Sequence, residues 1–209
     1  MKLKAVSFIY AFVSICICIC IHFLEANVNL VMLGYYGNTE SVFSLLVVSL
    51  IPIFFCAFIL SFYKNKIIYK ISSLAISFMY ALRITAFIKN MSNLNFEGKL
   101  TTGKAVFYGV LSFVFLLFVL SFLMLSLSRE IQMKATSLLK VISIISIVIF
   151  GLITLLFSLA IFILSDEADI RRFFIAFSTV FLLDVINYIL MLVSVNSLNK
   201  TLYESDKKD

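Results

Sequence analysis

The sequence predicts an all-α integral membrane protein: a polytopic bundle of six transmembrane helices with both termini in the cytoplasm. Three observations support this class. Of the 209 residues, 63% are apolar and only 13% are charged. The mean hydropathy is +1.13. Six glycines and one proline are too few for the turns of a loop-rich or all-β chain. A soluble domain of this length could not bury so much apolar surface, so the bilayer is the expected solvent.

Windows of about 20 apolar residues, enough to cross ~30 Å of hydrocarbon, identify the expected spans. The six candidates are 5–24, 42–63, 67–88, 105–128, 141–164 and 173–195. The segments between them are too short for a second, soluble domain. The chain therefore reads as one transmembrane domain, 1–209, ending in a short polar C-terminal tail at 196–209.

The first span carries small residues on one helical face, which favours close approach of another helix. The stripe consists of Ser7, Ala11, Ser14 and Cys18, and the fifth span has a second stripe of Ser143, Ser146, Gly151, Thr154 and Ser158. We expect these two helices to pack together. An alternative for the first span is a signal peptide with Lys2 and Lys4 as its basic start, although its apolar run is long for a signal core.

The second span contains Pro52, which removes one backbone hydrogen bond and predicts a kink. The third span is interrupted by Arg83, whose insertion cost roughly cancels the gain from its eight Ile, Leu and Phe residues. This helix is therefore expected to depend on its neighbours. Tyr80 and Ser72 share the helical face of Arg83.

The sixth span places Asp184 near its middle, with further polar residues on the same face. Asn187, Tyr188 and Ser194 lie with it inside an arc of about 120°. Counted from the outer span ends, Arg83 and Asp184 differ in depth by ~9 Å, a distance that an extended arginine can cover. We expect the two side chains to pair directly or through water.

Three roles are open for the two charged residues. The pair can fix which helices pack together, in a medium that offers little hydrophobic drive for association. It can instead belong to a substrate-binding or ion-binding site made of Arg83, Asp184, Asn187, Tyr188 and Tyr80. The third alternative is that each side chain reaches toward the membrane surface without a partner.

The distribution of basic residues predicts the orientation. With the N terminus inside, the cytoplasmic segments carry eleven Lys and Arg, whereas the outer loops carry five, beside six Asp and Glu. This asymmetry accounts for the net charge of +6 without nucleic acid as a partner. The expected partners are the lipid bilayer and either another membrane protein subunit or a second copy of the chain. The expected location is the plasma or inner membrane.

Cys18, His22 and Glu25 lie on one face of the first span, as a nucleophile, base and orienting group would. Cysteine is, however, commonly a small apolar residue, and the chain has one histidine and no CxxC pair. We predict no catalytic residues, no metal site and no cofactor. Two function classes remain: a small transporter or accessory subunit of a transport complex, and a non-transporting assembly, immunity or scaffold protein that binds another membrane protein through its helices.

Overall fold

The computed structural model describes residues 66–127, 129–163 and 168–206, together with 5, 8, 9, 11–13, 16, 50, 51 and 53–58. The described residues are helical apart from short turns at 97–101 and 126–127. They include four long helices: α3 (Lys66–Phe96), α4 (Thr102–Leu125), α5 (Arg129–Ile163) and α6 (Ala168–Asp206). The described part of the chain contains no strand, which confirms the all-α class.

Three of these helices are long and apolar enough to cross a membrane. They contain the segments Ile67–Phe96, Thr102–Leu125 and Ile131–Ile161, and α6 has a shorter apolar segment at Phe181–Asn196. Their length and composition indicate a helical membrane protein. The spans 5–24 and 42–63 lie largely outside the described residues, so the count of six spans and the cytoplasmic location of the termini stay predictions.

The observed helices extend well beyond the predicted spans. α3 continues to Phe96 rather than ending at 88, and α5 begins at Arg129 rather than at 141. The C-terminal segment expected as a polar tail is helical as far as Asp206. The apolar window marks only the part of a helix that lipid can surround. Polar residues without Gly or Pro continue the same backbone hydrogen bonds into water.

The turn between α3 and α4 is defined by a glycine and a threonine. Gly98 has a φ of 67°, a left-handed conformation that glycine adopts without a steric penalty. The amides of Gly98 and Lys99 donate to the carbonyls of Asn95 and Leu94, which completes a Schellman cap. Thr101 then caps α4, accepting a hydrogen bond from the Lys104 amide.

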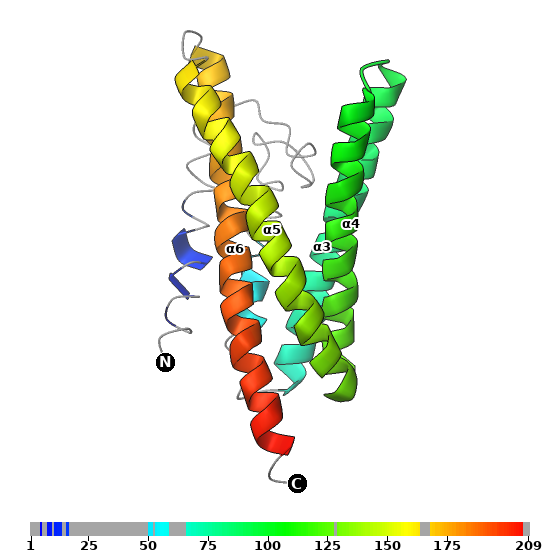
Figure 1. Ribbon diagram of the computed structural model, residues 1–209, viewed down its shortest axis with the longest axis vertical. Helices are drawn as coiled ribbons and strands as arrows, with labels where there is room; N and C mark the ends of the chain where they lie inside the picture. The colour runs from blue at the N-terminus through cyan, green and yellow to red at the C-terminus, as the bar shows by residue number, and fades with distance from the viewer. Residues whose placement is uncertain are drawn as a thin grey trace.

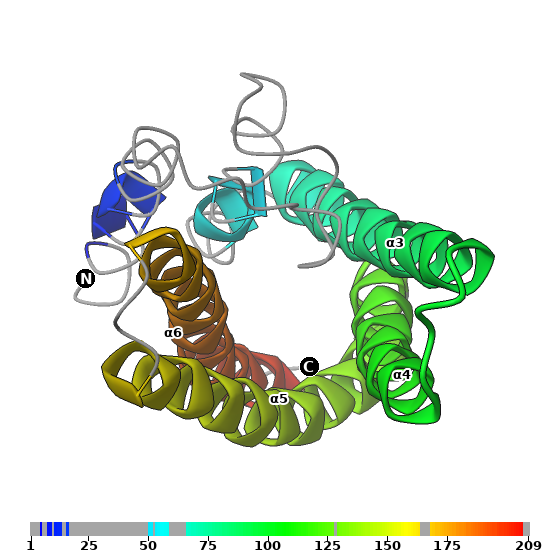
Figure 2. The same ribbon diagram turned by 90° about the horizontal axis from the view of Figure 1, so that it is seen from above.

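The four helices form two antiparallel hairpins, α3–α4 and α5–α6, which meet where α4 packs against α5 (Figure 1). The hairpins lie close at the end that holds the α4–α5 turn and diverge toward the other end. Seen along the bundle, α3, α4, α5 and α6 follow one another in an arc (Figure 2). Extensive packing joins neighbours along this arc, and α3 and α6 are not such a pair.

The outer surface of the hairpins is apolar, unlike that of a soluble protein. Large apolar side chains such as Ile67, Phe78 and Leu156 are more than 60% exposed, as lipid-facing residues would be. Polar side chains instead lie between helices. Ser73 and Ser77 of α3 donate hydrogen bonds of 2.6 and 3.0 Å to carbonyls of α4. These contacts fix the register of the first hairpin.

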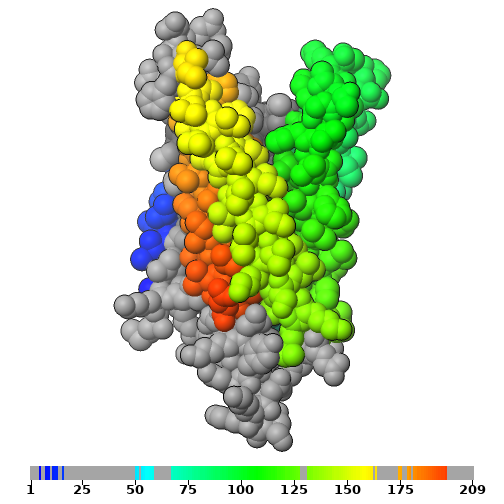
Figure 3. All heavy atoms as spheres, in the orientation of Figure 1, coloured from blue at the N-terminus to red at the C-terminus, as the bar shows by residue number. Residues whose placement is uncertain are grey.

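The face between the diverging ends of α4 and α5 is hollowed (Figure 3). Beyond Phe150, no described residue of α5 is buried. Leu152, Leu155 and Leu159 of this segment are each about half exposed, and so is Val110 of α4. The rings of Phe115 and Phe150 meet with centroids 6.0 Å apart and join the two helices below this hollow.

Candidate intramembrane ion-pair site

Arg83 and Asp184 form a direct, two-pronged ion pair between α3 and α6. Nη1 of Arg83 donates to Oδ1 of Asp184 at 2.9 Å, and Nη2 donates to Oδ2 at 2.8 Å. The arginine is 1% exposed and the aspartate 3%. The pairing expected from the sequence is thereby confirmed in its direct form, and the geometry is the parallel arrangement that matches guanidinium to carboxylate most strongly.

The depth difference of ~9 Å expected from the sequence depends on where each helix is taken to end. It assumed that the spans end at residues 88 and 173, whereas α3 ends at Phe96 and α6 begins at Ala168. Counted from these observed ends, Arg83 is 13 residues deep and Asp184 is 16. At 1.5 Å per residue the offset is only about 4.5 Å, which allows direct contact.

The rest of both predicted polar faces is also buried. Tyr80 and Tyr188 are 0% exposed, and Asn187 is 2% exposed. The Tyr80 hydroxyl makes no hydrogen bond to a described residue. Oδ1 of Asn187 makes no hydrogen bond within the part of the chain that the structure describes. Hydrogen-bonding capacity therefore remains beside the ion pair.

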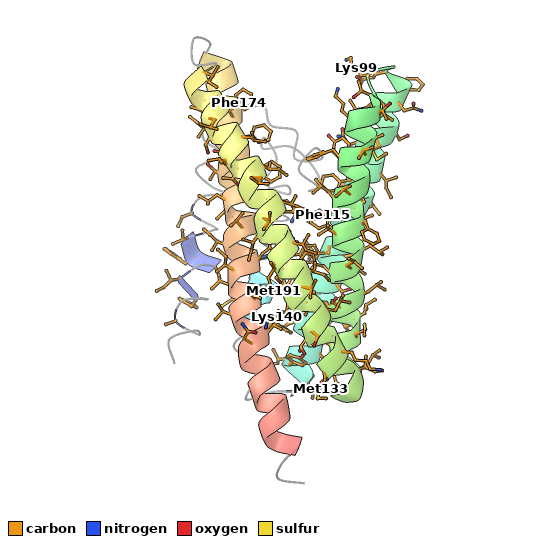
Figure 4. The ribbon with its side chains drawn as sticks, viewed as in Figure 1. Lys99, Phe115, Met133, Lys140, Phe174 and Met191 are labelled. Carbon is orange, nitrogen blue, oxygen red and sulfur yellow. The ribbon has the colours of Figure 1, made fainter. Side chains whose placement is uncertain are left out.

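Phe115 of α4 supports the guanidinium. The central carbon of the Arg83 guanidinium lies 4.4 Å from the centroid of this ring, in cation–π geometry. Phe115 lies at mid-height on the side of α4 that faces the other hairpin (Figure 4). Its ring also packs against Phe87 and Tyr80 of α3, each with centroids 5.5 Å apart. One ring thus links the ion pair to the packing of the first hairpin.

Aromatic rings enclose the pair on the side of the α4–α5 turn. Tyr80 lies one turn before Arg83, and Tyr188 lies one turn after Asp184. Because α3 and α6 run in opposite directions, both rings lie on the same side of the pair. Phe118 of α4 stacks between them, with ring centroids 4.9 Å from Tyr80 and 5.2 Å from Tyr188. Charged groups so enclosed are largely removed from water.

A second set of rings lies toward the hollow. Phe150 of α5 contacts Phe115 at 6.0 Å and Phe181 at 5.7 Å between centroids. It also contacts Tyr188 at 5.3 Å and so connects the two sets. Phe87 of α3, whose ring stacks on Phe115, belongs to the same set. The ion pair therefore lies between two aromatic layers to which all four long helices contribute.

The structure describes part of the two predicted stripes of small residues. Ser143 and Ser146 are fully buried on α5, whereas Gly151, Thr154 and Ser158 are only partly buried. A Cβ added at Gly151 would meet no atom within 4 Å, so this glycine provides no close approach. Of the other stripe, Ala11 is buried at 8% exposure. Ser7, Ser14 and Cys18 lie outside the described residues, and so do His22, Glu25 and Pro52.

Sequence analysis missed the aromatic enclosure of the pair. Phe115, Phe118 and Phe122 recur at helical spacing on α4, which places them on one face. All three are fully buried. That spacing was a usable signal for a face turned toward the bundle interior. Searches against protein-family models, curated proteins and solved structures find no match to this chain.

Proposed function

We propose that this chain is a membrane transport protein, or a membrane-embedded accessory subunit of a transport complex, whose working site is the Arg83–Asp184 pair. One observation carries the proposal: a guanidinium and a carboxylate, both almost completely buried, join two helix hairpins near their mid-height. Ionisable groups inside spans are costly and typically mark substrate or ion pathways. Packing alone does not require them, because apolar replacements of buried ion pairs are often neutral or stabilising.

The arrangement of the hairpins supports a gating role for the pair. The α3–α4 and α5–α6 hairpins diverge beside a hollow, and the pair connects them below it (Figures 1 and 3). While Arg83 holds Asp184, the hairpins stay together and the site is closed by aromatic rings. When the pair opens, the hairpins can separate and the two charged groups become accessible to a substrate.

The second candidate is a non-transporting assembly, immunity or scaffold protein. The observation that favours it is the enclosure of the ion pair between the Phe118 and Phe150 layers. In such a protein the pair only sets which helices pack together, and the hairpins do not move. The two candidates therefore differ in whether the region around Asp184 ever becomes accessible to water.

Thiol labelling distinguishes the candidates. We would replace the four native cysteines by alanine, introduce Asn187→Cys, and add a membrane-impermeant thiol reagent to the protein in lipid vesicles. If the pair is a gate, labelling is slow in the otherwise unchanged chain. It becomes about tenfold faster when Asp184→Asn weakens the pair, because the open population rises.

A matched control separates gating from unfolding. Ser121 is fully buried on α4 and its hydroxyl bonds only to its own helix, at Leu117, in the described structure. Ser121→Cys must stay unlabelled in the same Asp184→Asn background. Absence of labelling at position 187 in every folded variant would contradict the transport proposal, and a stoichiometric membrane protein that copurifies would then support the scaffold.

A further inference from the structure

We infer that the Arg83–Asp184 site binds an organic cation, a guanidinium or a protonated amine, and that the Arg83 guanidinium occupies the place of this ligand in the closed protein. The inference deepens the proposed transport function, and it rests on that proposal for the claim that the bound cation is transported. The binding itself can be tested without any transport assay.

The ion pair is accompanied by further buried oxygen atoms on α3 and α6. Asp184 offers both carboxylate oxygens, and they hold the guanidinium at 2.8 and 2.9 Å. Oδ1 of Asn187, three residues further on α6, is buried with no hydrogen bond in the described structure. The Tyr80 hydroxyl is also buried, and it makes no hydrogen bond to a described residue. A donor-rich cation larger than one guanidinium fork could satisfy these oxygens.

The walls of the site also suit a cation. The Phe115 ring lies under the guanidinium at 4.4 Å, and the faces of aromatic rings carry negative electrostatic potential. Tyr80 and Phe118 continue this surface, since their rings stack at 4.9 Å. A carboxylate combined with aromatic faces is the chemistry that recognises alkylammonium and guanidinium groups.

An anion fits the same surroundings poorly. To reach Arg83 it would have to displace Asp184, leaving a buried carboxylate without a partner and next to a second negative charge. An incoming cation instead keeps Asp184 paired. The displaced arginine has a long, flexible stem that allows its head to withdraw. Each exchange displaces one charged side chain, but only the arginine can move its charge away from the membrane interior, which favours a cation.

The test compares ligands against variants of the purified full chain in detergent. The probes are methylguanidinium chloride and ethylammonium chloride, with sodium acetate as the anionic comparison and sodium chloride to equalise ionic strength. The proteins are the unchanged chain, Arg83→Ala, Arg83→Lys and the double variant Arg83→Ala with Asp184→Ala. The readouts are the thermal midpoint as a function of probe concentration and the apparent Kd obtained from it.

Methylguanidinium should stabilise Arg83→Ala with an apparent affinity about tenfold or more above that of the unchanged chain, because the tethered competitor is gone. Arg83→Lys should fall between the two, since an ammonium cannot make the two-pronged contact. The double variant should show no stabilisation. If Arg83→Ala does not fold, the comparison of Arg83→Lys with the unchanged chain gives the same ordering.

The inference would be overturned if neither cation stabilises any variant, or if acetate stabilises the unchanged chain more than methylguanidinium does. Failure of the transport proposal looks different. If a cation binds in a way that requires Asp184 but position 187 is never labelled, the cation site is supported and the transport proposal is contradicted. If position 187 is labelled but no cation binds, the transport proposal is supported and the inference of a cationic ligand is contradicted.

Discussion

Replacing Arg83 and Asp184 by leucine, singly and together, measures how far each charge depends on the other. Arg83→Leu removes two charge-assisted hydrogen bonds and the cation–π contact with Phe115, and it leaves Asp184 buried without its partner. Loss of one member of a buried pair typically costs about 3–5 kcal/mol of folding free energy. Asp184→Leu should cost a similar amount, because it strands the guanidinium.

The double variant should recover most of this loss. Two leucines leave no uncompensated charge, and apolar replacement of a buried pair is often close to neutral, so we expect stability within about 1 kcal/mol of the unchanged chain. The coupling energy between the two positions, the sum of the single losses minus the loss in the double variant, should then be about 5 kcal/mol or more. For comparison, interhelical hydrogen bonds in membranes contribute on average only ~0.6 kcal/mol, well below this coupling energy.

Unfolding in mixed micelles, followed by circular dichroism as the fraction of sodium dodecyl sulfate increases, gives these free energies. Lys89→Leu is the matched control on the same helix, since Lys89 is exposed and the change also removes one charge. Single variants that each lose less than about 1 kcal/mol, with losses that simply add in the double variant, would refute the reasoning.

Three further predictions concern the first hairpin and use the same unfolding measurement. Ser77→Ala removes the 3.0 Å bond to the Val119 carbonyl and should cost about 0.6 kcal/mol; no loss would mean that the bond does not fix the register. Tyr108→Phe removes the 2.7 Å bond from Asn90 and should cost about 1 kcal/mol, whereas a neutral result would show that water replaces it. Gly98→Ala should cost about 1 kcal/mol through its φ of 67° alone, since an added Cβ would meet no atom within 4 Å, and a stabilising effect would contradict the left-handed turn.

The charged pair could be anticipated because intramembrane charges are rare and helical spacing limits which face they occupy. Arg83 and Asp184 were each identifiable from the sequence, and so were the buried faces that carry Tyr80 and Asn187. Their depth was harder to predict. A hydropathy window locates the lipid-facing part of a helix, whereas relative depth depends on where the helix actually ends, as Phe96 illustrates.

The surroundings of the pair could not be derived in the same way. Phe115 and Phe118 look like ordinary apolar residues of a span, and only the packing of α3, α4 and α6 turns them toward the charges. The interhelical bonds of Ser73 and Ser77 are similar, since a membrane helix tolerates serine on any face. Packing between distant segments decides these roles, and one sequence does not contain that information.

The most direct test of the account is the distance between the tips of the two hairpins. Lys99 lies at the tip of the α3–α4 hairpin (Figure 4) and Ile163 ends α5. Their side chains are 67% and 78% exposed, so Lys99→Cys and Ile163→Cys can carry spin labels for double electron–electron resonance in lipid, after alanine replaces the native cysteines. The account predicts one narrow distance distribution in the paired protein and a second, longer distance when Asp184→Asn weakens the pair. An unchanged distribution in a folded Asp184→Asn protein would contradict the claim that the Arg83–Asp184 pair holds the hairpins together.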